Sequence, residues 1–341
     1  KGRPVILGIN LETHEYENDS NQVLESLNAS KQVEDTPKRI KMLFNHADIG
    51  GQLTKKSFAY TMLYAAERIP EIADQLYSID EGMKAGFAWE YGPFQYWDIV
   101  GLEAGIKAIE ELGKQVPAWV IEMKNNGFET FYTTIDSKPA YYNINTQKYE
   151  SVPGFESIVR VDYLTKEKIV YQNDETKLYD IGDDVLCLEF TSKMNAIGAG
   201  ILNGLQDAVR IAEEGKWRGL VIGNHSKNFT VGANIMLIAM LAYEQEFDEL
   251  NRAVDLFQQT TMRCRYSKVP VVAATQGYVF GGGCELIMHC DATAVGAESY
   301  IGLVEVGVGL IPGGGGTKEF AVRTSDSFTE GDVQIPALIE N

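Results

Sequence analysis

The chain has 341 residues, 45% of them hydrophobic and 23% charged, which is the composition of a folded globular protein of about two domains. Its formal net charge of −18 argues against binding to nucleic acid or to an anionic membrane surface. A small anionic ligand stays compatible with this charge, because local backbone N–H groups can bind it. We therefore expect a cytoplasmic protein with no nucleic-acid partner and no integral membrane segment.

The first part of the chain, up to residue 135, has mainly helical patterns. Apolar residues at helical spacing begin near Thr54, are interrupted at Pro70 and resume at Ile72. Further helices are predicted over 102–112 and 120–128. We assign residues 1–135 to a mostly helical domain with short connections.

The segment 136–178 differs from what precedes it. Its tyrosines at 141 and 142 and its apolar residues at 158, 159 and 161 indicate short strands or an irregular linker. We interpret 136–178 as the linker between two domains.

Strands and helices alternate from residue 179 to 341. Strands are predicted over 185–190, 219–223 and 269–274, and helices over 201–211 and 247–262. This alternation is typical of an α/β architecture. The chain begins with Lys1 rather than methionine, so we expect it to be part of a longer protein.

Several common functional motifs are missing from the sequence. The four cysteines, Cys187, Cys264, Cys284 and Cys290, have no CxxC spacing, which predicts free and mostly buried thiols in a reducing compartment. The four histidines show no metal-binding spacing, so we expect no metal site. The glycines at 198–204 and 307–312 do not fit a dinucleotide fingerprint, and there is no P-loop or GxSxG elbow.

Three glycine-rich turns, at 229–235, 277–285 and 305–317, carry the strongest chemical signal. Consecutive glycines at 281–283 let a ligand approach the backbone, and N–H groups at the start of a helix can donate to a negative oxygen. Gly232 and Ala233 repeat this arrangement in the first turn. If the two turns converge, their N–H groups form an oxyanion hole, although each turn alone is also compatible with a simple tight connection.

Two glutamates lie beside these turns. Glu285 is expected in the first turn of a helix, and Glu305 lies in an apolar stretch where a charged carboxylate is disfavoured. Two carboxylates near one carbonyl can activate a water molecule and move a proton. Each glutamate also has a purely structural alternative. Glu285 could be a surface residue that complements the helix dipole, and Glu305 could be a solvent-facing residue at the end of a strand.

These ordered motifs resemble the enoyl-CoA hydratase/isomerase (crotonase) family. The resemblance covers about Tyr179 to Thr317 and includes VLCLEF, FTVGANI, VPVVAATQGYVFGGGCE and EVGVGLIPGGGGT. It implies an α/β crotonase-like fold of ββα units over residues 179–341. The family domain runs on for many more residues than Lys318–Asn341, so we expect a C-terminally truncated domain.

The resemblance also implies the site residues. The oxyanion hole would be the backbone N–H groups of Ala233 and Gly282, and the catalytic carboxylates would be Glu285, which deprotonates a water molecule, and Glu305, which supplies a proton. The acyl-CoA thioester would contact Val231, Gly232, Ala233, Asn234, Ile235, Met236, Gly281, Pro312 and Gly313. The family usually has Asp where Asn234 stands, a change that should be tolerable in a residue that supports its loop.

A second resemblance concerns the helical part. Residues 40–130, and Ser78–Leu102 above all, resemble the C-terminal helical domain of 3-hydroxyacyl-CoA dehydrogenases, with Gly92-Pro93-Phe94 forming a rigid turn into a helix. This implies a fragment of a bifunctional fatty-acid β-oxidation enzyme. Its NAD would bind a dehydrogenase domain outside this chain, and hydration itself would need no cofactor.

The function predicted from both resemblances is hydration of 2-enoyl-CoA to 3-hydroxyacyl-CoA. Two alternatives stay open: Δ3,Δ2-enoyl-CoA isomerisation in the same fold, and a non-catalytic body that binds acyl-CoA. A homo-oligomeric assembly also stays open.

Overall fold

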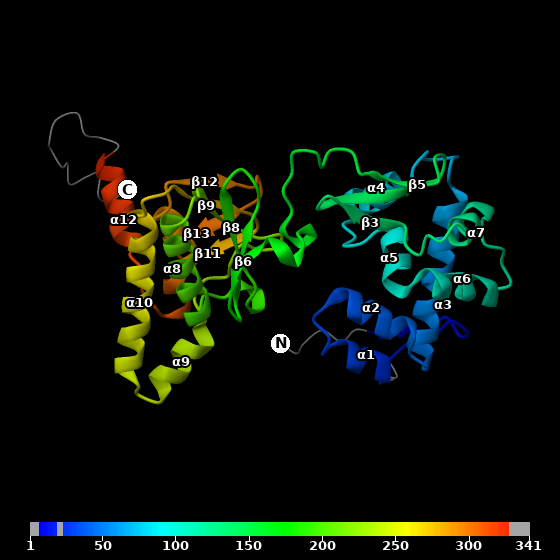
Figure 1. The fold of residues 1–341 in the computed structure, drawn as a ribbon. Helices are drawn as coiled ribbons and strands as arrows, with labels where there is room; N and C mark the ends of the chain where they lie inside the picture. The colour runs from blue at the N-terminus through cyan, green and yellow to red at the C-terminus, as the bar shows by residue number, and fades with distance from the viewer. Residues whose placement is uncertain (1–6, 19–22, 327–341) are drawn as a thin grey trace. The chain divides into compact units, whose positions relative to one another are not determined.

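The structure is a computed structural model that describes residues 7–18 and 23–326. The chain forms two compact units, Lys1–Ser157 and Ile158–Asn341 (Figure 1). The sequence prediction of a mainly helical part followed by an α/β part agrees with the elements found in each unit.

The first unit is mainly helical. Its helices are α1 (Glu25–Ser30), α2 (Thr36–Phe44), α3 (Ile49–Glu67), α4 (Leu76–Phe87), α5 (Pro93–Val100), α6 (Leu102–Glu111) and α7 (Ala118–Asn125). Strands β1 (Leu7–Ile9) and β2 (Tyr16–Asn18) form an antiparallel pair, and β3 (Tyr132–Ile135), β4 (Lys138–Asn143) and β5 (Lys148–Ser151) form an antiparallel sheet. Helix α3 begins earlier than the predicted pattern at Thr54, because Asp48 caps it by accepting a hydrogen bond from the Gly51 amide.

The turn at Gly92 and Pro93 leads directly into α5, as the sequence predicts. Pro93 is the first residue of the helix, where its missing N–H costs no hydrogen bond. The carboxylate of Asp80 accepts hydrogen bonds from the next two amides, Phe94 (3.0 Å) and Gln95 (3.1 Å). A Cβ at Gly92 would lie 2.4 Å from Cα of Asp80, so only glycine fits there.

Large buried side chains join the helices of the first unit to its small sheet. Among them are Phe44, Met62, Phe94, Trp97, Ile109, Met123, Phe131 and Tyr142. Because β4 and β5 pack on this core, the first part of the predicted linker 136–178 belongs to the helical unit. Its last part forms β6 and β7 of the second unit, so the boundary between the units, at 157–158, lies inside the predicted linker.

Two buried carboxyl groups make the stability of the first unit depend on pH. Burial raises the pKa of Asp80 and of Asp98 to about 7, from an ordinary value of 3.8. The folded state then favours the protonated forms, so this stabilisation is complete below about pH 4 and is lost as the pH rises through about 7. We expect the free energy of unfolding of this unit to fall between these values.

Urea denaturation at a series of pH values measures the free energy of unfolding. Hydrogen exchange of the amides of α4 and α5 at each pH assigns the change to the first unit. Replacing both residues (Asp80→Asn and Asp98→Asn) should flatten the curve. A wild-type curve that is already flat over this range would contradict the assignment.

A six-stranded sheet forms the centre of the second unit, in the order β12-β10-β9-β8-β7-β6 (Figure 1). Its strands are β6 (Ile169–Gln172), β7 (Thr176–Asp180), β8 (Val185–Phe190), β9 (Gly219–Gly223), β10 (Val271–Thr275) and β12 (Ala292–Val295). Strands β8, β9, β10 and β12 pair in parallel, whereas β7 pairs antiparallel with both β6 and β8. The predicted bounds of β8 and β9 are confirmed. Strand β10 begins two residues later than predicted, after Pro270, which has no N–H for the ladder.

Helices cover this sheet and follow its strands. They are α8 (Ala199–Glu214), α9 (Ile235–Tyr243), α10 (Phe247–Arg265), α11 (Gly282–Met288) and α12 (Gly316–Asp326), and a parallel pair of strands, β11 (Tyr278–Phe280) and β13 (Tyr300–Gly302), lies beside α11. The buried face of α8 packs on β7, β8 and β9 and on α10. Helices α8 and α10 are longer than predicted, and α9 is absent from the prediction.

Candidate active site

The first glycine turn presents the amide of Ala233. The residues on either side of it bond to Ile197: the Ile197 amide donates to the Gly232 carbonyl (2.8 Å), and the Asn234 amide donates to the Ile197 carbonyl (3.2 Å). In such a parallel bridge the two flanking residues bond to the partner strand, and the N–H of the residue between them points away from that strand. The Ala233 N–H is therefore directed away from Ile197. Gly232 has a φ of +92°, which glycine adopts without strain.

The second glycine turn presents the amide of Gly282. Gly282 is the first residue of α11, so its N–H has no partner inside the helix. Gly281, just before it, has a φ of +52° and a ψ of −118°, a conformation that requires glycine.

The two turns converge. A Cβ placed on Gly282 would lie 3.7 Å from the Ala233 nitrogen, and a Cβ placed on Gly232 would lie 3.5 Å from the Gly282 nitrogen. Ala233 and Gly282 also line the same cavity. The structure thus brings together the two amides that the sequence predicts as an oxyanion hole.

Glu285 is buried, with 1% of its surface exposed, and the backbone of the third glycine turn binds its carboxylate. Its Oε1 accepts hydrogen bonds from the amides of Gly314 (2.8 Å) and Gly316 (2.9 Å). Burial raises the pKa of Glu285, the charge of Glu305 raises it further, and the amide donors act in the opposite direction. Glu285 is therefore an oriented carboxylate inside the fold, and the alternative of a solvent-facing surface residue is wrong.

Glu305 begins a 3₁₀ turn (Glu305–Val308) that follows β13. Its Oε1 would lie 3.1 Å from a Cβ on Gly281, so the side chain reaches the second glycine turn. Its Oε2 is buried and has no hydrogen-bond partner within the described part of the chain. A buried oxygen of this kind, on the wall of the cavity that Glu285 also lines, is available to a substrate or to water.

One cavity of about 560 Å³ joins these groups. Of the predicted site residues, it is lined by Ala233, Asn234, Gly282, Glu285, Glu305 and Gly313. The remaining predicted contacts, Val231, Gly232, Ile235, Met236, Gly281 and Pro312, are not among its lining residues.

Helix α9 explains why part of the predicted acyl-CoA segment lies outside the cavity. Asn234 caps this helix by accepting a hydrogen bond from the Leu237 amide (3.2 Å). Leu237, Ile238 and Leu241 then fall on one face with Asn234 and line the cavity. Met236 falls on the opposite face and is 79% exposed.

Other apolar residues of the cavity wall were not predicted as site residues. They are Ile197, Leu202, Leu250, Val254, Leu256, Phe257, Leu310 and Ile311. The Phe257 ring lies against two of the glycine turns, since a Cβ at Gly282 would lie 2.8 Å from it and a Cβ at Gly314 would lie 2.5 Å from it. The helical spacing of Leu250, Val254 and Phe257 is the sequence signal for this wall, but it does not distinguish a cavity wall from a core.

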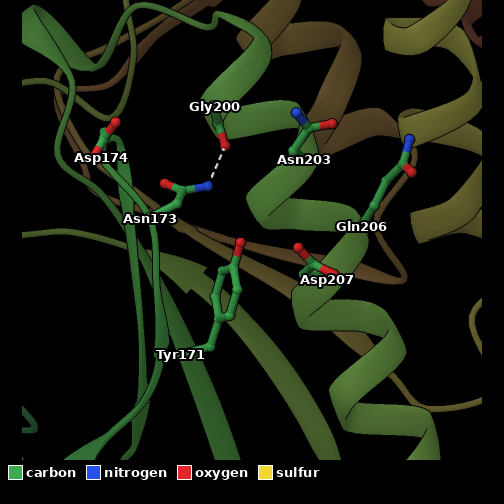
Figure 2. A pocket seen from close by; sticks show the side chains of 7 residues that line it. All are labelled: Tyr171, Asn173, Asp174, Gly200, Asn203, Gln206 and Asp207. Atoms are coloured by element: carbon green, nitrogen blue, oxygen red, sulfur yellow. Dashed lines mark hydrogen bonds between the residues drawn. The ribbon is translucent and has the colours of Figure 1, made fainter.

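A second hollow, of about 480 Å³, lies between the β6–β7 turn and α8 (Figure 2). Its side chains are polar, and the Asn173 amide donates to the Gly200 carbonyl (2.8 Å). The side-chain Oδ1 of Asn173 accepts hydrogen bonds from the backbone amides of Glu175 and Thr176 (both 2.8 Å). The bond to Gly200 holds the β6–β7 turn against the first part of α8, and the other two bonds stabilise the turn itself. None of the predicted site residues lines this hollow.

Residues 7–18 and 23–326 contain neither a metal-binding cluster nor a helix able to span a membrane. In these ranges no group of three or more His, Cys, Asp or Glu side chains is arranged to hold a metal ion. No helix there has both the length and the apolar character needed to cross a bilayer. All four cysteines are free and buried, as predicted, and burial raises the pKa of Cys187 and of Cys264 to about 12.

Comparison with known proteins extends these observations. Residues 182–334 match the family model described as "Enoyl-CoA hydratase/isomerase". The second unit has the crotonase fold. The chain is also similar to "Enoyl-CoA hydratase, mitochondrial" of Pongo abelii, with 34% identity over 136 residues, 40% of this chain and 45% of that protein.

Similarity over nearly the whole chain is found with larger proteins. "Probable 3-hydroxyacyl-CoA dehydrogenase" of Bacillus subtilis is 41% identical over 299 residues, 87% of this chain and 38% of that protein. "Putative fatty acid oxidation complex trifunctional enzyme" of Rickettsia felis is 28% identical over 319 residues, 91% of this chain and 41% of that protein. The chain thus spans about two fifths of the length of these relatives, and its helical unit takes part in the similarity.

Proposed function

We propose that the crotonase-fold unit hydrates 2-enoyl-CoA thioesters to 3-hydroxyacyl-CoA. The observation that carries this proposal is the single cavity that two backbone amides, Ala233 and Gly282, share with two carboxylates, Glu285 and Glu305. Amides suit a thioester oxygen that gains negative charge, and a carboxylate pair suits the addition of water to the adjacent double bond.

The two amides would bind the thioester oxygen. When water attacks C3, the electrons of the double bond move toward that oxygen, and two N–H donors stabilise the resulting enolate. One such donor is typically worth about 3 kcal/mol of barrier height.

The two carboxylates would transfer the protons. Glu285 removes a proton from the attacking water, and a pKa raised by burial makes it a stronger base near neutral pH. Glu305, on the same cavity wall, supplies the proton that forms the C2–H bond. Exchange with solvent then returns the proton held by Glu285 to Glu305 before the next cycle.

The acyl chain would occupy the apolar side of the cavity. Leu237, Ile238, Leu241 and Phe257 supply hydrocarbon surface there and no charge. Burial of an alkyl chain against such surface gives roughly 0.8 kcal/mol per CH₂. This side of the cavity therefore supplies affinity, and the two amides fix the orientation of the thioester.

We also propose a role for the longer protein. A 3-hydroxyacyl-CoA is the substrate of NAD-dependent oxidation, and the helical unit is similar to a protein named as a 3-hydroxyacyl-CoA dehydrogenase. Hydration would precede this oxidation in fatty-acid β-oxidation, in the cytoplasm. NAD would be bound by a dehydrogenase domain and not by the residues of this chain, and hydration would use no cofactor.

An assay with two substrates tests the proposed reaction. The intact protein is given crotonyl-CoA and, separately, a 3-enoyl-CoA, and the ultraviolet absorbance of the conjugated thioester is followed. Hydration removes this absorbance from crotonyl-CoA. A rise of absorbance with the 3-enoyl-CoA and no reaction with crotonyl-CoA would favour isomerisation, and binding without turnover of either would favour a non-catalytic acyl-CoA-binding body.

A further inference from the structure

A cluster of charged side chains joins α10, the end of α11 and α12. Its centre is Glu319 of α12, which is 1% exposed. Oε2 of Glu319 is 2.5 Å from Nη1 of Arg265, and Oε1 is 2.5 Å from Nζ of Lys318. A carboxylate buried this deeply is stable in its charged form only with such partners.

His289, the C-cap residue that follows α11, connects this cluster to Glu285. Its ring is as buried as Glu319, and its Nδ1 is 2.6 Å from the backbone carbonyl oxygen of Glu285. A carbonyl oxygen only accepts, so Nδ1 carries the proton and donates. Nε2 of the neutral ring then accepts from Lys318 Nζ at 3.3 Å, and it lies 3.5 Å from Glu319 Oε1.

The same ring touches the turn that holds the carboxylate of Glu285. A Cβ on Gly315 would lie 3.4 Å from both Cε1 and Nε2 of His289. Gly315 lies between Gly314 and Gly316, whose amides donate to Glu285 Oε1. One buried imidazole therefore contacts both the backbone of Glu285 and the turn that orients its side chain.

Helices α10 and α12 hold the other side of this turn. The Gln258 side chain donates to the Gly313 carbonyl (2.7 Å), and the Thr261 hydroxyl donates to the Gly314 carbonyl (3.2 Å). The Glu319 amide donates to the Gly315 carbonyl (3.0 Å). On the α11 side, the Glu285 carboxylate and the His289 ring contact the turn.

We propose that His289 and Glu319 are positioning residues for Glu285: they hold α11 against the 313–316 turn so that the Glu285 carboxylate keeps its place in the cavity. The role in turnover rests on the proposed hydration. The role in holding the turn does not depend on it. Neither side chain touches substrate, so their loss should change kcat and leave the affinity for acyl-CoA almost unchanged.

The test compares His289→Leu and His289→Asn in the intact protein. Leucine keeps the bulk of the ring and removes both hydrogen bonds, and we expect kcat for crotonyl-CoA to fall roughly 10- to 100-fold. KM and the Kd for butyryl-CoA, a saturated thioester that cannot be hydrated, should stay within about twofold. Asparagine can place an amide N–H near the position of Nδ1 and should restore most of kcat. His225→Leu, at an exposed histidine outside the cavity, is the matched control and should keep wild-type kcat.

Amide hydrogen exchange gives a readout that needs no activity. In His289→Leu the amides of residues 313–316 should exchange at least tenfold faster, with β8, β9 and β10 unchanged. Wild-type kcat in His289→Leu, or unchanged exchange at 313–316, would overturn the proposal. Faster exchange throughout the second unit without rescue by asparagine would also overturn it, because His289 would then stabilise the whole unit by packing rather than position Glu285. A wild-type protein without hydration would refute the proposed function alone, because exchange still decides the positioning role.

Discussion

Replacing Glu285 or Glu305 by glutamine is expected to reduce kcat for hydration by roughly 10²- to 10⁴-fold, the usual range for loss of a general acid or base. Glutamine keeps the size of the side chain, and at position 285 it keeps an oxygen that can accept from the Gly314 and Gly316 amides. It can neither take a proton from water nor supply one to C2. Steady-state kinetics with crotonyl-CoA, together with the Kd for butyryl-CoA, measure the two effects separately.

The matched control for these variants is Glu298→Gln, at an exposed glutamate of the turn between β12 and β13. It should keep wild-type kcat. The mechanism would be refuted if Glu285→Gln and Glu305→Gln both kept wild-type hydration. Loss of butyryl-CoA binding in parallel with kcat would instead indicate that these carboxylates shape the cavity rather than transfer protons.

A methyl group at Gly282 should be almost as damaging, with kcat reduced roughly 10²-fold or more. In Gly282→Ala the new Cβ would lie 3.7 Å from the Ala233 nitrogen, in the space that the thioester oxygen needs. It would also lie 2.8 Å from the Phe257 ring, which must move. Loss of a single oxyanion donor commonly costs 10²- to 10³-fold, and displaced substrate loses both donors.

Gly307→Ala is the control for this substitution. Gly307 follows Glu305 in the 3₁₀ turn, but a Cβ there would meet nothing within 4 Å. The two variants are compared by kcat and by thermal unfolding, so that a folding defect is seen directly. Wild-type turnover by a folded Gly282→Ala protein would be evidence against an oxyanion hole at this position.

Local patterns predicted much of the second unit correctly. Strands β8 and β9 have the predicted bounds, because continuous apolar runs between turn residues are typical of buried parallel strands. Helix α9 was missed because its apolar side chains occur all round the helix, and only one face of it lines the cavity. Both ends of the predicted linker 136–178 form strands of the two units, such as β4 and β6, which pair as antiparallel hairpins with neighbouring strands in the chain. Strands this short depend on their surroundings more than on the preferences of their own residues.

The sequence by itself determined the chemical parts of the candidate site: glycines where a backbone amide must be reached, and glutamates in apolar surroundings. Only the tertiary structure decided how these parts meet. The amides that orient Glu285 lie 29 and 31 residues further along the chain, and the carboxylate of Glu319 lies close to the imidazole of His289 through the packing of α12 on α11. Such contacts join segments that are far apart in the chain, and spacing in the sequence carries no information about their distance in space.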